Sequence, residues 1–528
     1  MKSIKILIIT VATLGLVSCE DFLTTEPLTT VTDVNYYKTP GDAYTALVGC
    51  YDGLQTVWSN AVSVPLVSEI MSDNCYGGFG ASDAYNFQAI DEFNIDRAPS
   101  YQNLYGDNWS AYYEAVYRCN VLLGKMDQIE WGTEENLRAG YEAEARFIRA
   151  YLYFDMVRLW GNIPLITEPT TDNVQQAAPA DVYKLIAEDL VFAAANLDGD
   201  PYTSQNPSTY GRVTKWAAEA LIGRAYLYYT GYYGQSDLAG VVSGTQALAY
   251  LEDVIANGGF GLVEDFANLW PAASGANYAG EDNKETVFAI KYTYTSDYNG
   301  NTDGNHWLVM FGMREQSFYP YGNGWGGGTV NPKLWNAYDD TDTRKVASII
   351  SVEDEELDFD ETRQREYTGY YTKKYTPLSD ADGNSVAVEL GGTNFMIGQF
   401  QDYVSIRYAD VLLMAAELGS ANAQSYFDMV RQRAYGDAFT ALSPTTANIM
   451  NERYLEFALE GIRYYDLLRQ GLDVASAAIT ETTTLLSGGA EETVTISAEN
   501  FMETQGLQQI PYTQITLSSG VLKQNAGW

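Results

Sequence analysis

The sequence predicts a mostly α-helical fold, with helical pairs in both halves of the chain and a long, irregular, loop-rich insertion with minor β-structure between them. Apolar residues recur at spacings of three and four within residues 40–257, and helical segments return within residues 402–470. The intervening stretch is rich in glycine, asparagine and tyrosine and has no such period. At 528 residues, the chain is long enough to bury a large core.

The N-terminus has the pattern of a lipoprotein signal peptide over residues 1–18. Lys2 and Lys5 precede an apolar run, residues 6–17, that is too short to span a bilayer as a stable helix. The run closes at Cys19, which we expect to be lipidated, with residues 19–39 as a tether. Several acyl chains anchor a protein stably in a membrane. An ordinary secretory signal is the alternative interpretation.

Two segments of the predicted N-terminal helical region, residues 40–257, show the clearest periodicity. An apolar stripe over residues 145–159 predicts one helix, which Gly161 and Pro164 end. A second helix is predicted over residues 213–229. It contains Ile222-Gly223-x2-Tyr226, the spacing of a tetratricopeptide first helix, in which the glycine lets the partner helix approach closely.

The C-terminal region, residues 258–528, divides into three parts. Residues 258–401 form the loop-rich insertion, in which 286–292 has the composition of a strand and 297–328 is expected to be loop. Residues 402–470 carry helices predicted at 404–419, 422–435 and 447–470. Residues 471–528 form a tail with little helical period. We expect all these regions to pack as one globular unit.

Composition excludes several function classes. The net charge of −38 repels polyphosphate, so nucleic acid is not an expected partner. Cys50, Cys75 and Cys119 have no CxxC spacing and are expected to be small buried hydrophobes. The single histidine, His306, cannot supply a multi-histidine metal site, and no GxSxG motif accompanies it. We therefore expect no enzyme, no catalytic residues, no metal and no cofactor.

The motifs together resemble the SusD/RagB family of surface lipoproteins. The segments that carry the resemblance, in the family's order, are Cys19-Glu20-Asp21-Phe22-Leu23, Ala143 to Ala150 with Trp160 to Leu165, Arg212 to Ala218, Arg407-Tyr408-Ala409-Asp410, and Glu452-Arg453 to Arg469. Two departures are Ala526 in place of the family's proline near the C-terminus, and the lack of a lysine or glutamine before the acids that follow Cys19.

The resemblance implies a SusD-like body of four tetratricopeptide-like helix pairs and a lipid-anchored protein on the cell surface, at the outer membrane. It also implies a role in nutrient uptake and polysaccharide utilization: carbohydrate binding, followed by delivery to a SusC-like TonB-dependent transporter. The acids and arginines of residues 452–469 recur beside an apolar face, so we interpret them, with Glu144 and Arg146, as ion pairs between helices rather than as chemistry.

Capture of a neutral oligosaccharide or polysaccharide needs aromatic rings for the sugar faces and amides or carboxylates for the hydroxyls, displayed on loops. Two aromatic loop segments fit, with a few tyrosines near them. The predicted ligand-binding residues are Trp307, Trp325, Tyr321, Tyr319, Asn305, Tyr76, Tyr85, Tyr298 and Tyr292.

Three other interpretations stay open. A surface glycoside hydrolase would need two carboxylates at a set separation, which a sequence does not reveal. A purely protein-binding repeat module would leave the aromatic, glycine-rich loops without a purpose. The ligand of a binding protein could also be a peptide, as in the RagB branch of the family. The sugar and its linkage are not predicted.

Overall fold

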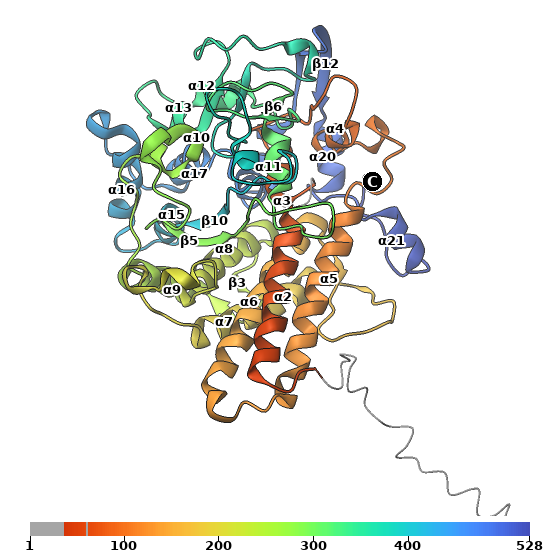
Figure 1. The fold of residues 1–528 in the computed structure, drawn as a ribbon, viewed down its shortest axis with the longest axis vertical. Coiled ribbons are helices and arrows are strands. Elements are labelled where there is room, and N and C mark those ends of the chain that lie inside the picture. Colours follow the sequence, from red (N-terminus) through yellow and green to blue (C-terminus); the bar gives the residue numbers. More distant parts are fainter. Residues whose placement is uncertain (1–35, 60–61) are drawn as a thin grey trace, which may run out of the picture.

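The computed structural model describes residues 36–59 and 62–528. The predicted signal peptide and Cys19 lie outside the described residues. Figure 1 shows long helices, among them α2 and α5, in the lower half of the molecule, and short elements joined by loops in the upper half. The mostly α-helical fold predicted from the sequence is confirmed.

Long helices dominate the N-terminal half. Their bounds are α2 Pro40–Ser59, α3 Val64–Ile70, α4 Tyr85–Asp91, α5 Gly106–Lys125, α6 Glu135–Trp160, α7 Pro179–Asn196, α8 Lys215–Tyr233 and α9 Gly244–Asn257. Two pairs of two-residue strands lie in the connections: β1 Ile163–Pro164 with β2 Gln176–Ala177, and β3 Asp237–Leu238 with β4 Val242–Ser243. Both helices predicted here, over residues 145–159 and 213–229, are confirmed as parts of α6 and α8.

These helices stack in order. α2 packs on α5, α5 on α6, α6 on α7, α7 on α8, and α8 on α9. The stack resumes after the insertion, because α15 (Tyr408–Glu417) packs on α9 and on α16 (Ala423–Tyr435). Four helix pairs, α2/α5, α6/α7, α8/α9 and α15/α16, therefore make up the tetratricopeptide-like body of the described chain.

The α8/α9 pair shows why the tetratricopeptide spacing includes a glycine. α8 begins where the Thr214 hydroxyl accepts a hydrogen bond from the N–H of Ala217, and it ends at Gly234 with a φ of 64°. A Cβ added to Gly223 would lie 2.6 Å from a methyl carbon of Leu251 on α9. Only glycine lets the two helices come this close.

A small antiparallel sheet closes the base of the insertion. β5 (Thr286–Ile290), which the sequence predicts as a strand, pairs with β10 (Tyr403–Arg407), with Ile290 opposite Tyr403. Residues 291–402 thus leave and rejoin the helical body at one place. This arrangement holds the loops of the insertion over one end of the helix stack (Figure 1).

Within the insertion the elements are short. The helices are α10 Pro271–Ser274, α11 His306–Phe311, α12 Pro332–Ala337, α13 Arg344–Ser348 and α14 Val386–Glu389, and the paired strands are β6 Met313–Arg314 with β7 Asn323–Gly324 and β8 Ile349–Ser351 with β9 Tyr370–Thr372. The prediction that residues 297–328 are all loop is wrong at α11. A capping asparagine followed by a continuous apolar run forms this helix, although the run is too short to show a period.

The C-terminal elements also depart from the prediction. The helix predicted over 447–470 is two helices, α17 Thr446–Glu456 and α18 Arg463–Leu468, separated by Leu459 and Gly461, which both have positive φ. The tail contains α19 Leu472–Ile479, α20 Ala498–Thr504 and α21 Tyr512–Leu517, and a hairpin of β11 Glu481–Ser487 and β12 Ala490–Ile496. The Gly488-Gly489 turn, with both φ values positive, closes this hairpin.

Short 3-10 turns lie in the connections of both halves. They are Ile95–Arg97, Met126–Gln128, Gly132–Glu134, Tyr202–Ser204, Pro207–Thr209, Phe266–Leu269, Gly275–Asn277, Glu361–Arg363 and Gly436–Ala438.

The charged motif of residues 452–469 joins the C-terminal helices, as predicted, since Arg453 of α17 pairs with Asp410 of α15 and Asp466 of α18. A second set of pairs ties α17 to the small sheet. The Arg407 guanidinium lies 2.6 Å from Glu285, 2.9 Å from Glu456 and 2.8 Å from Glu460, and all four side chains are buried. The neighbouring arginines hold the pKa of the Glu456 carboxyl well below its usual range, against the effect of burial. Cys50, Cys75 and Cys119 are free and buried, which confirms their predicted role as small core residues.

Candidate functional site

The two aromatic loop segments predicted from the sequence lie side by side in the structure. The backbone N–H of Tyr76 in the first donates to the carbonyl of Thr329, which directly follows the second, at 3.0 Å. The Asp83 carboxylate of the first lies 2.7 Å from the Arg314 guanidinium of the second. The loops of the insertion and of the N-terminal half therefore form one continuous face, which we call the loop face.

Trp307 lies in the core and not on the loop face. It belongs to α11, whose N-terminus is capped by Asn305, since that side chain accepts from the N–H of Leu308 (3.1 Å) and donates to the carbonyl of Gln401 (2.8 Å). Both Trp307 and Asn305 are fully buried, and the Trp307 ring centroid lies 5.2 Å from that of Tyr375. The structure leaves neither residue a surface for a ligand, because helix formation turns this segment inward.

Three of the predicted tyrosines are also buried. The Tyr76 hydroxyl donates to Glu481 (2.9 Å), the Tyr321 hydroxyl donates to Glu355 (2.6 Å), and Tyr292 is 6 % exposed. Burial, and then the carboxylates beside them, raise the pKa values of Tyr76 and Tyr321 well above the usual value. These rings pack beneath the loops and have little area for a ligand.

The remaining predicted aromatic residues reach the surface. Tyr298 is 67 % exposed, Tyr319 is 68 % exposed, Tyr85 is 39 % exposed, and Trp325 is partly buried. The Arg365 guanidinium lies 3.7 Å from the Tyr85 ring centroid, so it covers one face of this ring and fixes its orientation. The predicted ligand contacts that stay available are therefore Tyr85, Trp325, Tyr298 and Tyr319.

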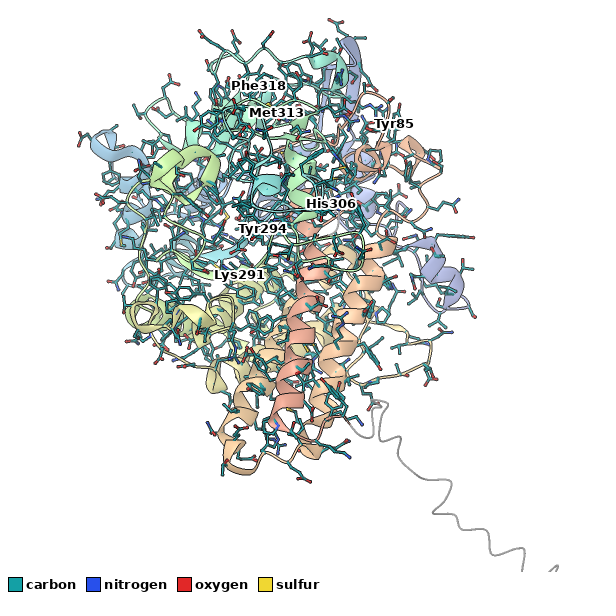
Figure 2. The ribbon with its side chains drawn as sticks, viewed as in Figure 1. Tyr85, Lys291, Tyr294, His306, Met313 and Phe318 are labelled. Carbon is teal, nitrogen blue, oxygen red and sulfur yellow. The ribbon has the colours of Figure 1, made fainter. Side chains whose placement is uncertain are left out.

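His306 also lies beside this surface, although the sequence alone gives reason to weigh it only as a metal ligand or a catalytic base. Its ring meets Trp325 edge to face, with centroids 5.5 Å apart. Burial lowers the pKa of His306, so the imidazole is neutral at pH 7. In the view of Figure 2, His306 lies between Tyr85 and Tyr294. The contact with Trp325 depends on the fold of α11 against β7, for which the sequence has no signal.

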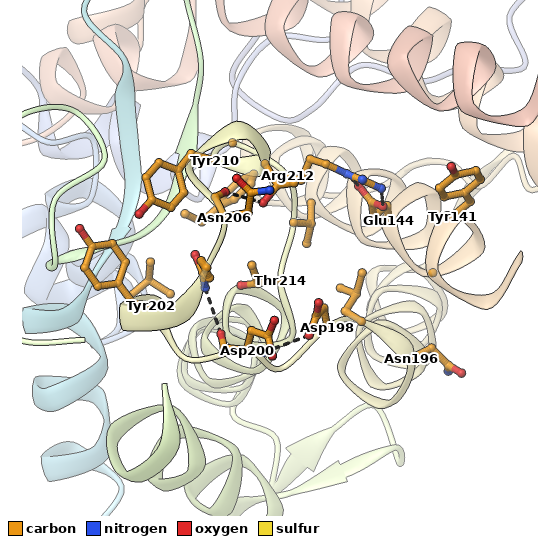
Figure 3. A pocket seen from close by; sticks show the side chains of 18 of the residues that line it. Tyr141, Glu144, Asn196, Asp198, Asp200, Tyr202, Asn206, Tyr210, Arg212 and Thr214 are labelled. Carbon is orange, nitrogen blue, oxygen red and sulfur yellow. Dashed lines mark hydrogen bonds and ion pairs between the residues drawn. The ribbon is translucent and has the colours of Figure 1, made fainter. Parts of the chain in front are cut away.

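A cavity in the helical body was not predicted. It has a volume of about 550 Å³ and lies between α6, the end of α7, the connection that leads into α8 and the strand β5. In Figure 3, Tyr202 and Tyr210 lie at one end and Tyr141 lies at the other. The Tyr202 and Tyr210 rings are parallel, with centroids 6.2 Å apart and an interplanar angle of 8°. We call this cavity the helix pocket.

An ion pair forms one wall of the helix pocket. Arg212 is paired with Glu144 of α6, and its Nε donates to a Glu144 oxygen at 3.1 Å. The Tyr51 hydroxyl donates to the same carboxylate (2.5 Å) and accepts from the N–H of Val213 (2.8 Å). Hydrogen bonding to Glu144 raises the pKa of the Arg212 guanidinium. The structural role predicted for Glu144 is confirmed, since it joins α2, α6 and the connection before α8.

Within residues 36–59 and 62–528, no group of three or more His, Cys, Asp or Glu side chains is arranged to hold a metal ion. In the same ranges, no helix is long and apolar enough to cross a membrane.

Comparison with known proteins identifies the family. Residues 52–227 match a family described as "Starch-binding associating with outer membrane", and residues 356–528 match the SusD family. Among curated proteins, the chain is 26 % identical to SusD-like protein P2 of Formosa agariphila, over 89 % of this chain and 91 % of that protein. It is also 26 % identical to a SusD-like protein of Bacteroides ovatus, over 89 % and 82 %.

Comparison with solved structures supports the same family. Surface glycan-binding protein A from Bacteroides fluxus superposes with a TM-score of 0.76 at 25 % identity, over 93 % of this chain and all of that one. A laminarin-binding SusD-like protein superposes with a TM-score of 0.72 at 26 % identity, over the same shares. The class of protein is therefore a SusD-like helical protein, with tetratricopeptide-like pairs and a loop-rich insertion. The chain belongs to the SusD/RagB family.

Proposed function

We propose that this protein binds a neutral oligosaccharide or polysaccharide at the cell surface and delivers it to a SusC-like TonB-dependent outer-membrane transporter. The support comes from its relatives, among which are surface glycan-binding proteins, one of them in complex with laminarihexaose, and a laminarin-binding SusD-like protein. The description of the family that matches residues 52–227 adds starch binding and association with the outer membrane.

The observation that carries the proposal is the loop face. Tyr85, Tyr298 and Tyr319 present exposed rings on the insertion and the segment beside it, and Trp325 adds a partly buried ring. Asp83 and Arg314 supply charged groups on the same face. One ring stacked on a sugar face contributes about 0.5–1.5 kcal/mol. Two or three rings with a few hydrogen bonds therefore support an affinity in the micromolar to millimolar range, which suits a protein that must release its cargo.

The proposed ligand is uncharged because the protein is strongly acidic. A net charge of −38 disfavours polyanionic polymers at low ionic strength. Arg314 and Arg365 do not offer free cations on the loop face, since Arg314 pairs with Asp83 and Arg365 lies over Tyr85 and donates to the carbonyl of Ala81 at 2.7 Å.

The proposed mode of action is binding without cleavage. Hydrolysis would need a pair of carboxylates facing the ligand. The buried carboxylates of the C-terminal motif are engaged in ion pairs: Glu456 is 3.0 Å from Arg344, and Glu452 is 2.6 Å from the same guanidinium. The relatives named above are described as binding proteins and not as hydrolases.

Two measurements on the mature protein test this proposal together. Isothermal titration with laminarihexaose and with maltohexaose should give saturable heat for at least one glucan, and an assay of reducing ends should detect no new ends after prolonged incubation. Release of reducing ends would favour the hydrolase. Binding of peptides, with no response to glycans, would favour a RagB-like peptide carrier.

Anchoring at the membrane is proposed from the sequence of the N-terminus. Lipidation at Cys19 would tether the protein to the outer membrane, with the acidic pair Glu20-Asp21 directing it outward. Cys19→Ala should abolish incorporation of labelled palmitate and release the protein from the membrane fraction. Protease added to whole cells should degrade the wild-type protein, and full protection from it would contradict outward exposure.

A further inference from the structure

The helix pocket is a built cavity with no role in the proposed capture at the loop face. We propose that it is a second binding site, which takes a neutral mono- or disaccharide unit. The proposal does not rest on the loop face, because the walls of the pocket come from α6, α7, the connection into α8 and the strand β5, and none of the predicted loop-face rings lines it. It holds even if the loop face binds nothing. The argument uses the size of the cavity, its rings, its hydrogen-bonding groups and its charge.

Size and shape fit a small polar ligand. A volume of about 550 Å³ falls within the range of roughly 300–1,000 Å³ that small-molecule pockets occupy. Helices close the pocket on two sides, and two short 3-10 turns of the connection, Tyr202–Ser204 and Pro207–Thr209, close it on a third. The connection is long for one between packed helices, and it folds over the helix ends instead of joining them directly.

The rings are placed for stacking. Tyr202 and Tyr210 form a flat pair at one end, and the Tyr202 hydroxyl is held by the carbonyl of Asp282 at 2.9 Å. Tyr141 at the opposite end is partly exposed, and the Arg212 guanidinium lies 5.9 Å from its centroid. Flat rings at both ends of a polar cavity suit the apolar faces of a sugar better than a compact ion.

Polar groups with free hydrogen-bonding capacity lie between the rings. Within the described part of the chain, the Asp198 carboxylate accepts one hydrogen bond, from the backbone N–H of Asp200, and the Asn206 side chain accepts one, from the N–H of Ser208. Each keeps further acceptor or donor positions that point toward solvent. Carboxylates and amides of this kind can form bidentate hydrogen bonds with the vicinal hydroxyls of a sugar.

The charge of the helix pocket disfavours an anionic ligand. Arg212, the cation that lines the pocket, is already paired with Glu144, whereas Asp198 and Asp200 are exposed and carry no ion pair with any residue of 36–59 or 62–528. The pocket therefore has an excess of negative charge and would repel a phosphate or a uronic acid. An uncharged polyol meets no such penalty.

A second cavity lies next to the helix pocket. It has a volume of about 350 Å³ and lies on the other side of residues Tyr210, Gly211 and Arg212, between α2 and β5, where Tyr44 and Gln55 line it. Gly211 has a φ of 92°, and residues 210–212 line both cavities. A disaccharide seated in the helix pocket could thus extend across Gly211 toward the ring of Tyr44, which is 46 % exposed.

The test fills the pocket without disturbing the fold. Gly140 lies on the pocket-facing side of α6, its φ is not positive, and a Cβ added there meets no atom within 4 Å. Gly140→Trp should therefore occupy the cavity, and Gly140→Ala is the matched control that adds one methyl group. Both are made with Trp325→Ala already present, so that the loop face does not dominate the signal.

Binding is measured by saturation-transfer difference NMR with glucose, galactose, mannose, maltose, cellobiose and laminaribiose, and with glucuronic acid and lysine as charged probes. We expect transfer to at least one neutral sugar, a loss of at least fivefold for Gly140→Trp and for Tyr210→Ala, a smaller loss for Gly140→Ala, and no change for Tyr101→Ala, an exposed tyrosine elsewhere. Glucuronic acid should bind more weakly than glucose.

Three outcomes would overturn the proposal. One is the absence of transfer to every neutral sugar at millimolar concentration. Another is transfer that Gly140→Trp leaves unchanged although the melting temperature shows a folded protein. The third is lysine binding that no neutral sugar displaces, which would assign the pocket to amines. Loss of glycan binding at the loop face alone would instead count against the proposed function and leave this inference standing.

Discussion

Tyr85 and Trp325 come from the two loop segments that we propose to face the ligand, and each ring contacts a neighbouring side chain. Arg365 lies against one face of Tyr85, and His306 meets the edge of Trp325. Because these contacts fix the rings before a ligand arrives, little conformational entropy is lost when a sugar stacks on them. The energy of stacking can then appear as affinity.

We predict that Tyr85→Ala and Trp325→Ala each weaken glycan binding about two- to twelvefold, which corresponds to the loss of about 0.5–1.5 kcal/mol of stacking. Isothermal titration measures the affinities, and differential scanning calorimetry checks that each variant is folded. Tyr117→Ala, at a tyrosine that is 50 % exposed on α5, is the matched control and should bind as the wild type does. Unchanged affinity in both variants would move the ligand site away from these rings.

A second prediction at the residue scale concerns Glu219 and the dependence of stability on pH. Glu219 is 2 % exposed on α8, one of its oxygens has no hydrogen-bond partner among the described residues, and Lys215 lies 3.5 Å away. Burial raises its pKa to about 8, and Asp253 adds to the rise although Lys215 opposes it. The folded protein therefore keeps a proton that the unfolded chain loses above about pH 4.3.

Since the folded-state pKa of this acid is raised, its contribution lowers stability as pH rises from about 4.3 to about 8. Glu219→Gln should be more stable than the wild type at pH 8.5 by on the order of 1 kcal/mol, and the difference should shrink toward zero near pH 4.5. Urea titrations at several pH values measure it. A difference that grows toward acid pH would contradict the assignment.

The predicted site residues show what a sequence can and cannot locate. That aromatic rings gather in two glycine-rich segments was readable from composition, and those segments do lie together. The sequence does not show whether a given ring points outward. Trp307 points inward because Asn305 caps its helix, and Tyr321 points inward because its hydroxyl donates to Glu355. Both orientations depend on partner residues that the hydrophobic periodicity of the sequence does not reveal. Tyr202 and Tyr210 escaped notice for the same reason.

At the scale of elements, the α8/α9 contact gives a matched pair of glycine substitutions. Gly223→Ala places a methyl group 2.6 Å from Leu251, whereas Gly140→Ala on α6 meets open space. We predict that Gly223→Ala destabilises the protein by about 1–3 kcal/mol through overpacking and that Gly140→Ala stabilises it by about 0.5–1 kcal/mol through helix propensity. Denaturant unfolding measures the change in the free energy of unfolding for both variants. Changes of the same sign would contradict the close packing of α8 on α9.

The long helices were predictable and the short elements were not, for a physical reason. A helix such as α6 has several turns, so its apolar stripe repeats often enough to be recognised, and Gly161 marks its end. α11 has too few residues to show a period, and its six residues form a helix because Asn305 caps them and the core surrounds them. The break between α17 and α18 is fixed by Leu459 and Gly461, and the leucine alone would not have suggested it.

At the scale of the whole molecule, β5 and β10 bring both ends of residues 291–402 to one place on the helix stack. The helix stack and the loop-rich insertion are thus distinct parts of the chain, but they share one core, since Trp307 of α11 is fully buried and Arg344 of α13 pairs with Glu452 and Glu456 of α17. This division places the proposed ligand contacts at one end and leaves the outer faces of the long helices for a partner.

A large rigid helical body suits docking on a membrane transporter, because little order has to be gained on binding. We predict that gentle detergent extraction and a pull-down through a tag on this protein recover a large outer-membrane barrel in near-stoichiometric amount. The Cys19→Ala variant should recover less of it, since the tether raises the local concentration at the membrane. Recovery of the lipoprotein alone, where other outer-membrane complexes survive the same detergent, would contradict the delivery step.

Capture of a neutral glycan is the central claim, and a glycan array tests it most directly. The purified mature protein is applied to immobilised neutral and acidic glycans, beside a Tyr85→Ala, Trp325→Ala, Gly140→Trp variant that alters both the loop face and the helix pocket. The account predicts that the wild type is retained by at least one family of neutral glycans, that acidic polymers retain it less, and that the variant is retained poorly although it is folded. Retention by no neutral glycan, or equal retention of the wild type and the folded variant, would contradict it.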